Sequence, residues 1–386
     1  MYLEFDSIIN ESTHGIVRSP AVLFHDYFAI RGGGERLVLT LAHALDATLV
    51  HGYRTHETYD EADFPKRTRS LNFPSLLRRP GLRPLSLAAV FTLQRYDARR
   101  YAVRLFSGVA GLFAAPRKSK RGINVFYCHT PPRFLYDQAA YYLRGKSVLK
   151  RLAAYAFECQ YRRAVARMDI IVTNSQNTRA RIRHYLGRES IVVHPPVETD
   201  RFSWRGQGDY YLSTARLTPL KRVDRIVEAF LAMPDKRLIV TSGGEELERL
   251  KRLAANAPNI EFRGWVNDTE LLDLVGNAIA TIYLPVDEDF GMSPVESMAA
   301  GKPVIGVAEG GLLETVLPDE TGVLLPPQFT QADLIAAVRS MTPAKAEAMR
   351  YACEARAKDF SRGKFIATMK QLIDDALAGR SAPRAS

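Results

Sequence analysis

The chain has 386 residues, 46% of them hydrophobic, and a formal net charge of +11. This length exceeds what one hydrophobic core usually holds, so we expect two domains, and the apolar fraction excludes a disordered chain. No run of about 18 apolar residues is present, residues 1–19 lack the apolar segment of a signal peptide, and the three cysteines have no metal-ligand spacing. These features predict a reduced, cytoplasmic protein.

The first half of the chain alternates predicted strands and helices. A strand at 21–24 leads through His25 into a glycine loop at 31–35, where backbone N–H groups could approach a phosphate, and then into a helix at 35–45. The glycine spacing is not that of a dinucleotide fingerprint. Between 65 and 121 prolines interrupt the pattern, and we expect only one or two helices, within 85–106. Further strands are expected at 48–50, 123–128, 169–173 and 191–193, with helices at 147–167 and 175–186.

Positive charge is concentrated in this first half. Residues 1–190 hold 30 Lys and Arg against 15 Asp and Glu, whereas the remainder holds 23 against 27. Residues 66–121 contain 14 basic residues and a single acidic one, Asp97, with apolar residues such as Phe91 and Tyr96 between them. Two interpretations stay open: a basic amphipathic segment on an anionic membrane, and a solvated basic face whose apolar residues belong to the core.

The second half repeats the α/β alternation after a polar, aperiodic linker at 199–209. Alternating strands and helices in both halves predict two doubly wound parallel sheets. We therefore expect domains at 1–198 and 199–360, followed at 361–386 by a helix that crosses back to the first domain and a tail. Expected strands are 210–213, 238–241, 260–262, 279–284 and 304–307, and expected helices are 223–231, 245–256, 331–341, 343–360 and 362–377.

The stretch 285–316 carries two acidic residues, Glu288 and Glu296, separated by seven residues. Ser293 and Pro294 are predicted to cap and begin a helix, whose N-terminus would favour a phosphate group. The two glutamates could form an acid pair of the glycosidase kind, or be a capping carboxylate and a solvated side chain. Their spacing does not separate these alternatives.

Ligands of doubly wound domains bind at the carboxyl ends of strands, so polar residues at strand ends are candidates for a site between the domains. Arg216 follows the strand 210–213, and Lys221 comes five residues later. Two such cations could neutralise a diphosphate, although ordinary surface cations would show the same spacing. The strand-end candidates are His25, Gly32 to Gly34, His129, Arg216, Gly243, Gly244 and residues 287–293.

Several motifs resemble those of the retaining glycosyltransferases of family 4, which have the GT-B fold of two Rossmann-like domains facing a cleft. The acidic motif reads EDFGMSPVE and is followed by MAAGKPVIG and GGLLETV, while ARLTPLKRVDRIVEAF resembles the Arg…Lys phosphate motif. RGGGERL, YCHTPPRFLYD, TNSQNTRARI and HPPVETDRF resemble further family segments. The resemblance covers roughly residues 21–50, 123–200 and 210–325. It leaves out 52–121, as expected for an acceptor-side region.

The resemblance implies a role for each matching residue. Arg216 and Lys221 would hold the donor diphosphate, Glu296 the ribose hydroxyls, and Glu288 the transferred sugar, while His129 would contact the sugar near its reacting carbon. The resemblance also implies retention through a front-side transfer in which the leaving phosphate takes the acceptor proton. The remaining donor-binding candidates are Gly32, Gly33, Gly34, Gly243, Phe290, Gly291, Met292 and Ser293.

Residues 287–289 also read as Asp-x-Asp, a motif that metal-dependent transferases use. Because Arg216 and Lys221 already supply positive charge, we expect no metal and no cofactor beyond the nucleotide sugar.

We expect a mannosyltransferase-like enzyme at the inner face of the cytoplasmic membrane, attached through residues 66–121. It would move a hexose, with mannose from GDP-mannose as the first candidate, to a lipid-linked or polysaccharide acceptor. A soluble transferase making a small glycoside is the alternative. An α/β nucleic-acid-binding protein is a third reading, but the acidic second half argues against a continuous basic groove, and we expect no nucleic-acid partner.

Overall fold

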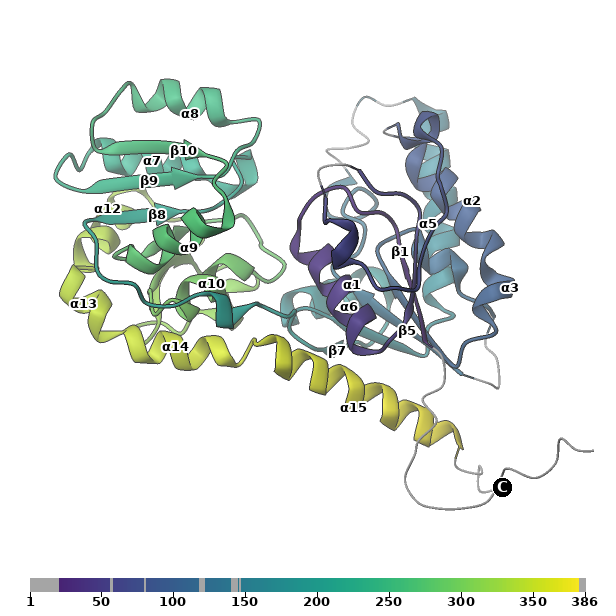
Figure 1. Cartoon of the computed structure of the whole chain (residues 1–386). Helices are drawn as coiled ribbons and strands as arrows, with labels where there is room; N and C mark the ends of the chain where they lie inside the picture. Colours follow the sequence, from purple (N-terminus) through teal and green to yellow (C-terminus); the bar gives the residue numbers. More distant parts are fainter. Residues whose placement is uncertain are drawn as a thin grey trace, which may run out of the picture.

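The computed structural model describes residues 21–55, 58–79, 81–117, 122–139, 145 and 147–381. Two α/β domains lie side by side, and the last helices run along one side of both (Figure 1). The strand order is β3-β2-β1-β4-β5-β6-β7 in the first domain and β10-β9-β8-β11-β12-β13 in the second. Within these sheets every pairing of the described strands is parallel. The prediction of two doubly wound parallel sheets is confirmed.

The first domain packs helices on both faces of its sheet. Its strands are β1 (Ala21–His25), β2 (Thr48–His51), β3 (Thr68–Ser70), β4 (Val103–Ser107), β5 (Ile123–Cys128), β6 (Ile170–Thr173) and β7 (Ile191–Val192). Its helices are α1 (Gly33–Ala44), α2 (Arg83–Leu93), α3 (Arg95–Ala98), α5 (Val148–Val165) and α6 (Gln176–Leu186), with a short 3-10 turn, η3 (Gly111–Ala114), between α2 and α5.

The second domain repeats this architecture. Its strands are β8 (Tyr210–Ser213), β9 (Arg237–Thr241), β10 (Ile260–Gly264), β11 (Thr281–Tyr283), β12 (Val304–Val307) and β13 (Gly322–Leu325). Its helices are α7 (Val223–Leu231), α8 (Leu247–Ala254), α9 (Asp268–Asn277), α10 (Met292–Ala299), α11 (Leu312–Thr315), α12 (Gln331–Ser340), α13 (Pro343–Ala348) and α14 (Arg350–Lys358). On α7 the apolar residues recur at helical spacing, and Val223, Ile226, Val227 and Phe230 are all buried.

The last helix, α15 (Arg362–Ser381), returns to the first domain. Its side chains Phe365, Met369 and Ile373 recur every four residues, so they lie on one face of the helix. They belong to the same buried cluster as Leu37 and Leu41 of α1. The core of the first domain is therefore completed by the end of the chain.

Strand β4 was not predicted, whereas the one or two helices expected within 85–106 are present as α2 and α3. The strand lies in the middle of the first sheet, between β1 and β5, and it contains Arg104. The Arg104 side chain is fully buried, and it donates hydrogen bonds to Asn124 Oδ1 at 2.6 Å and to the Tyr101 carbonyl at 2.8 Å. These bonds offset the cost of burying a charge, so a central strand can contain an arginine.

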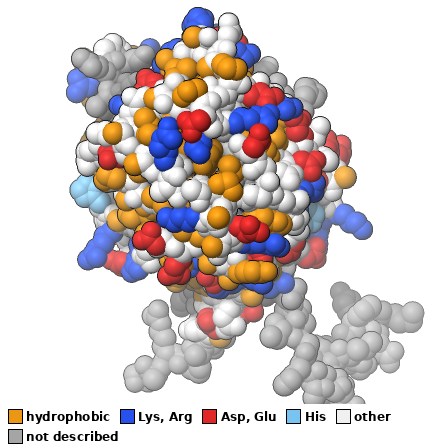
Figure 2. All heavy atoms as spheres, turned by 90° about the vertical axis from the view of Figure 1, so that its left-hand side faces the viewer, with side chains coloured by type: hydrophobic (Ala, Val, Ile, Leu, Met, Phe, Trp, Pro, Cys, Tyr) orange, Lys and Arg blue, Asp and Glu red, His pale blue; other side chains and the backbone are white. Residues whose placement is uncertain are grey.

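The other differences from the predicted elements are smaller. Strands β3 and β13 and helix α9 had not been predicted, and the helix expected over 343–360 is divided into α13 and α14. Figure 2 views the molecule from the side of the second domain, and there positive and negative side chains are interspersed. Among the described residues, no helix is both long and apolar enough to cross a membrane.

Candidate active site

The N-termini of two helices from different domains meet at the carboxyl ends of the sheets. Gly33 is the first residue of α1 and Met292 is the first of α10. A Cβ atom on Gly33 would lie only 2.2 Å from the Met292 sulfur, so the glycine loop passes directly against the second domain. Because helix N-termini carry partial positive charge, two of them facing one another favour an anionic ligand.

His129 lies beside this contact, immediately after β5. Its Nε2 is 2.9 Å from the Ser107 hydroxyl, and its ring lies 3.6 Å from where a Gly34 Cβ would stand. The Asn174 amide holds the His129 carbonyl at 2.9 Å. Burial lowers the pKa of His129 to about 4, so the imidazole is neutral near pH 7. The structure thus brings His129 together with the predicted glycine loop.

Lys221 and Glu288, two predicted catalytic residues, form an ion pair in the second domain. Lys221 also donates to the Tyr283 hydroxyl at 2.8 Å, and that hydroxyl donates to Glu288 Oε2 at 3.0 Å. The ammonium group is therefore fixed between a carboxylate and a phenol at the end of β11. Tyr283 was not among the predicted site residues.

Arg216 stands on a loop that is fastened to the predicted Gly243 segment. The Leu217 amide donates to the Gly243 carbonyl at 3.0 Å, and a Cβ on Gly244 would come within 2.2 Å of the Leu217 carbonyl oxygen. The Arg216 side chain itself is exposed. Fixed backbone with an exposed guanidinium is an arrangement suited to gripping a diphosphate.

The loop before α10 differs from the prediction at its helix start. Helix α10 begins at Met292 with Gly291 as its N-cap, so Ser293 is not the N-cap. Gly291 has φ 87°, a left-handed value that glycine adopts without strain, and this turn lets the helix begin before the Ser-Pro pair. The Phe290 side chain is buried against His194 and Phe360, which leaves only its backbone for a ligand.

Gly310 supports the Glu288 loop from behind, and we expect Gly310→Ala to lower the free energy of unfolding by about 2 kcal/mol or more. Its φ is 56°, and a Cβ there would lie 2.2 Å from the Glu288 carbonyl oxygen. Urea denaturation would measure the loss. The control is Gly363→Ala in α15, where a Cβ meets open space. Equal stability of both variants would contradict this role for Gly310.

Glu296 of α10 faces the first domain. Its Oε1 lies 3.6 Å from Arg36 of α1, and Arg36 lies 3.5 Å from Glu198. Burial raises the pKa of Glu296, while the Arg36 guanidinium opposes that shift. Arg36 and Glu198 fall inside quoted motifs, but neither was predicted as a site residue. A ribose bound to Glu296 would have to share this carboxylate with Arg36.

Arg181 of α6 links the two domains at the Asp-x-Asp segment. It forms ion pairs with Asp287 and with Asp289, the latter at 2.5 Å. Asn177 donates to Asp287 Oδ1 and to the Glu288 carbonyl, both at 3.1 Å. Burial raises the pKa of Asp289 to about 6, against the influence of Arg181. The Arg181 guanidinium is therefore already paired with both carboxylates of the Asp-x-Asp segment, which are the groups that would bind a metal ion.

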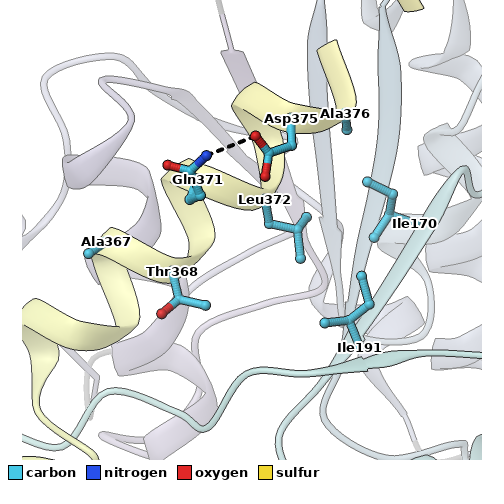
Figure 3. A pocket seen from close by; sticks show the side chains of 8 residues that line it. All are labelled: Ile170, Ile191, Ala367, Thr368, Gln371, Leu372, Asp375 and Ala376. Carbon is cyan, nitrogen blue, oxygen red and sulfur yellow. Dashed lines mark hydrogen bonds between the residues drawn. The ribbon is translucent and has the colours of Figure 1, made fainter. Parts of the chain in front are cut away.

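A crevice of about 810 Å³ lies elsewhere, between α15 and the edge of the first sheet (Figure 3). Ile170 and Ile191, which line it, are the first residues of β6 and β7. The crevice is thus at the amino ends of the strands, opposite the edge where ligands of parallel sheets bind. We do not assign the site to it.

Comparison with known proteins shows which family the chain resembles. The family model "Glycosyltransferase Family 4" matches residues 31–201, and "Glycosyl transferases group 1" matches residues 196–358. The "Alpha-1,3/1,6-mannosyltransferase ALG2" of Dictyostelium discoideum is 26% identical over 61% of this chain and 65% of its own. The "GDP-mannose-dependent alpha-(1-6)-phosphatidylinositol monomannoside mannosyltransferase" of Mycolicibacterium smegmatis is 30% identical over 41% of this chain and 49% of its own. The chain thus spans about half to two thirds of the length of these relatives.

Solved structures share the fold at low sequence identity. The sucrose-phosphate synthase of Thermosynechococcus elongatus superimposes with a TM-score of 0.73 and 18% identity, covering 93% of this chain and 99% of its own. WaaG, a glycosyltransferase involved in lipopolysaccharide biosynthesis, gives 0.70 and 14%, covering 92% and 99%. The prediction of the GT-B fold is therefore confirmed. Because the two family models together span residues 31–358, the chain belongs to the glycosyltransferases that they describe.

Proposed function

We propose that this protein transfers a hexose from a nucleotide sugar with retention of anomeric configuration and without a metal ion. The arrangement of Lys221, Glu288 and Tyr283 beside the N-terminus of α10 carries the proposal. The bond between the anomeric carbon and the diphosphate breaks, and its electron pair goes to the departing phosphate oxygen. The acceptor hydroxyl attacks from the same face, and its proton passes to that oxygen. Lys221, Arg216 and the helix N-terminus stabilise the charge that develops there.

Metal independence rests on the pairing of Asp287 and Asp289 with Arg181. Two carboxylates that are already paired with a guanidinium are poor ligands for a divalent cation, and the site has its own cations for the diphosphate. Transfer should therefore survive EDTA. Loss of turnover in EDTA, with recovery on adding magnesium or manganese, would contradict this part of the proposal.

For the donor we propose GDP-mannose, because the names of two relatives specify mannosyl transfer and one specifies GDP-mannose. In a thermal-shift panel of nucleoside diphosphates and nucleotide sugars, the true donor at about 100 times its Kd should stabilise the protein by about 2.7 kcal/mol. Arg216→Ala and Glu296→Ala should each reduce that shift. Arg225→Ala, on α7, is a matched arginine control and should keep it. If both site variants kept the full shift, the donor site would be misplaced.

For the acceptor we propose a lipid-linked glycan at a membrane surface. The relative from Mycolicibacterium acts, by its name, on a phosphatidylinositol glycoside. Helices α2 and α5 both contact η3 and so cover the same face of the first sheet. Around them, large apolar side chains are 45–77% exposed, and we call this set the α2–α5 surface. It comprises Leu82, Leu85, Leu93 and Tyr96 with Val148, Leu149, Leu152 and Tyr155.

Basic residues lie between these apolar side chains, and α5 contributes a part that the sequence did not indicate. Lys150 and Arg151 stand among the exposed apolar residues of α5. Such a surface combines burial of apolar groups in lipid with attraction of roughly 1 kcal/mol per basic residue to anionic headgroups. The alternative, a soluble transferase making a small glycoside, needs no such surface.

Liposome sedimentation distinguishes these two alternatives. The protein should bind vesicles containing anionic lipid more strongly than neutral ones, and Leu149→Ser with Tyr155→Ser should weaken that binding about tenfold or more. Tyr351→Ser changes another exposed tyrosine, on α14 in the second domain, and should leave binding unchanged. Negligible binding to both kinds of vesicle would favour the soluble alternative.

A further inference from the structure

Three polar side chains stand in a row at the carboxyl ends of adjacent strands of the first domain. His25 is the last residue of β1, Ser107 is the last of β4, and His129 follows β5. In the sheet register His25 lies opposite Ser107, and Ser107 lies opposite Tyr127. The Ser107 hydroxyl is 3.2 Å from His25 Nδ1 and 2.9 Å from His129 Nε2. One hydroxyl therefore joins two imidazoles.

This geometry allows three arrangements of protons when both rings are neutral. In the first, His25 Nδ1–H donates to Ser107, Ser107 donates to His129 Nε2, and His129 carries its proton on Nδ1. In the second, His129 Nε2–H donates to Ser107, Ser107 donates to His25 Nδ1, and His25 carries its proton on Nε2. In the third, both rings donate to Ser107, but the proton of this buried hydroxyl then has no acceptor among the described residues, which makes this arrangement costly.

Surroundings of His25 favour the first arrangement. Its Nε2 is buried, and among the described residues this atom has no hydrogen-bond partner. A proton there would be a buried donor without an acceptor, which is costly and rare, whereas an unused lone pair costs less. Nδ1, which lies 3.2 Å from the Ser107 hydroxyl, is therefore the nitrogen of His25 that carries the proton.

We infer that Ser107 and His25 are positioning residues that hold His129 in the tautomer carrying a proton on Nδ1, where it donates to the bound sugar. The Cε1 edge of the His129 ring faces Gly34 at the N-terminus of α1, with Nδ1 and Nε2 each 3.8 Å from where a Gly34 Cβ would stand, and Nε2 is the nitrogen that contacts Ser107. This inference rests on the proposed function for its ligand, the transferred sugar.

The neutral state of the rings fits this role. Burial lowers the pKa of His25 to about 3 and that of His129 to about 4. A sugar that becomes oxocarbenium-like gains positive charge, and an imidazolium beside it would be repelled. A neutral N–H can still hold a sugar hydroxyl, so a fixed tautomer supplies a donor without adding charge.

The test reads the tautomer directly and needs no substrate. In protein labelled with 15N-histidine, two-bond 15N–1H spectra distinguish Nδ1–H from Nε2–H, and the His129→Gln variant assigns the signal. We expect Nδ1–H in the unmodified protein and a change to Nε2–H in Ser107→Ala. Ser107→Thr, which keeps the hydroxyl, should retain Nδ1–H. His25→Asn places an amide N–H near the Nδ1 position and should also retain it, whereas His25→Gln should not.

Transfer assays complete the test. Ser107→Ala should lower kcat/KM roughly tenfold, as expected for one hydrogen bond, and should leave nucleoside diphosphate binding unchanged. The matched control is Ser190→Ala, which removes a buried hydroxyl that has no hydrogen-bond partner among the described residues. Nε2–H in the unmodified protein, or a Ser107→Ala variant with an altered tautomer and unaltered kcat/KM, would overturn the inference. If no nucleotide sugar supports transfer, the proposed function fails while the tautomer result still stands.

Discussion

Replacing Lys221 with methionine is expected to lower kcat/KM for sugar transfer by about a thousandfold. The ammonium group is fixed by Glu288 and by the Tyr283 hydroxyl at 2.8 Å, so it needs no reorganisation when charge develops on the leaving diphosphate. Removing one such preorganised charge-stabilising group costs roughly 100- to 1000-fold in an enzyme. Methionine keeps much of the side-chain volume, so the change tests the charge. Steady-state transfer to a fixed acceptor measures it.

Two further variants separate the charge of Lys221 from its packing. Lys251→Met alters an exposed lysine of α8 and should leave kcat/KM unchanged. If Lys221 acted only by holding Glu288, then Glu288→Gln would cost as much and the double variant no more. Full activity of Lys221→Met would refute the assignment of Lys221 to the leaving group.

Acidification from pH 7 to pH 5 is expected to lower the free energy of unfolding by about 3 kcal/mol. Burial lowers the pKa of His25 to about 3 and those of His51 and His129 to about 4. Below pH 6.5 these histidines become protonated in the unfolded chain, whereas their rings stay neutral in the folded state. This difference lowers the free energy of unfolding by about 2 kcal/mol per ring at pH 5.

Burial also raises the pKa of Asp26 and Asp289 to about 6, so the folded state gains protons at these two sites and recovers about 3 kcal/mol. Burial also raises the pKa of Glu35 and Glu296 and lowers the pKa of Lys302 to about 7, and these shifts act on the balance in opposite directions.

Urea denaturation at the two pH values measures this balance. In the variant His129→Gln, the decrease in the free energy of unfolding between pH 7 and pH 5 should be about 2 kcal/mol smaller, because its unfolded chain no longer binds a proton at residue 129. The matched control is His43→Gln on the exposed surface of α1, which should retain the full difference. Stability that rises between pH 7 and pH 5 would contradict the expected sign.

Strand and helix periodicity predicted most of the fold, and the failures have a common cause. Strand β4 was missed because Arg104 interrupts its apolar run, and sequence patterns place arginine in solvent. The hydrogen bonds from its guanidinium to Asn124, twenty residues away, and to the Tyr101 carbonyl help to make that burial possible. The start of α10 was misplaced because Ser293 and Pro294 look like a cap, whereas the left-handed turn at Gly291 begins the helix earlier.

In the site, residues inside one motif were easier to find than their partners. Lys221 and Glu288 were predicted separately, and the structure pairs them. Arg181 and Ser107 were missed because their contacts join distant parts of the chain: Arg181 meets Asp289 across 108 positions. Hydrophobic periodicity in the sequence gives no sign of a contact between residues this far apart. Ser107 was also hidden because its strand was not recognised.

Because α15 packs on the first domain, a helix that is synthesised late is needed to complete the core of a domain that is synthesised early. Residues 21–192 leave the ribosome first, yet Phe365, Met369 and Ile373 complete their core. At roughly 5–20 residues per second, the nascent first domain waits on the order of 10 s with Leu37 and its neighbours uncovered. Translation of a messenger RNA truncated before codon 365 would produce chains in which this apolar surface stays exposed. Chaperones and proteases would recognise such chains.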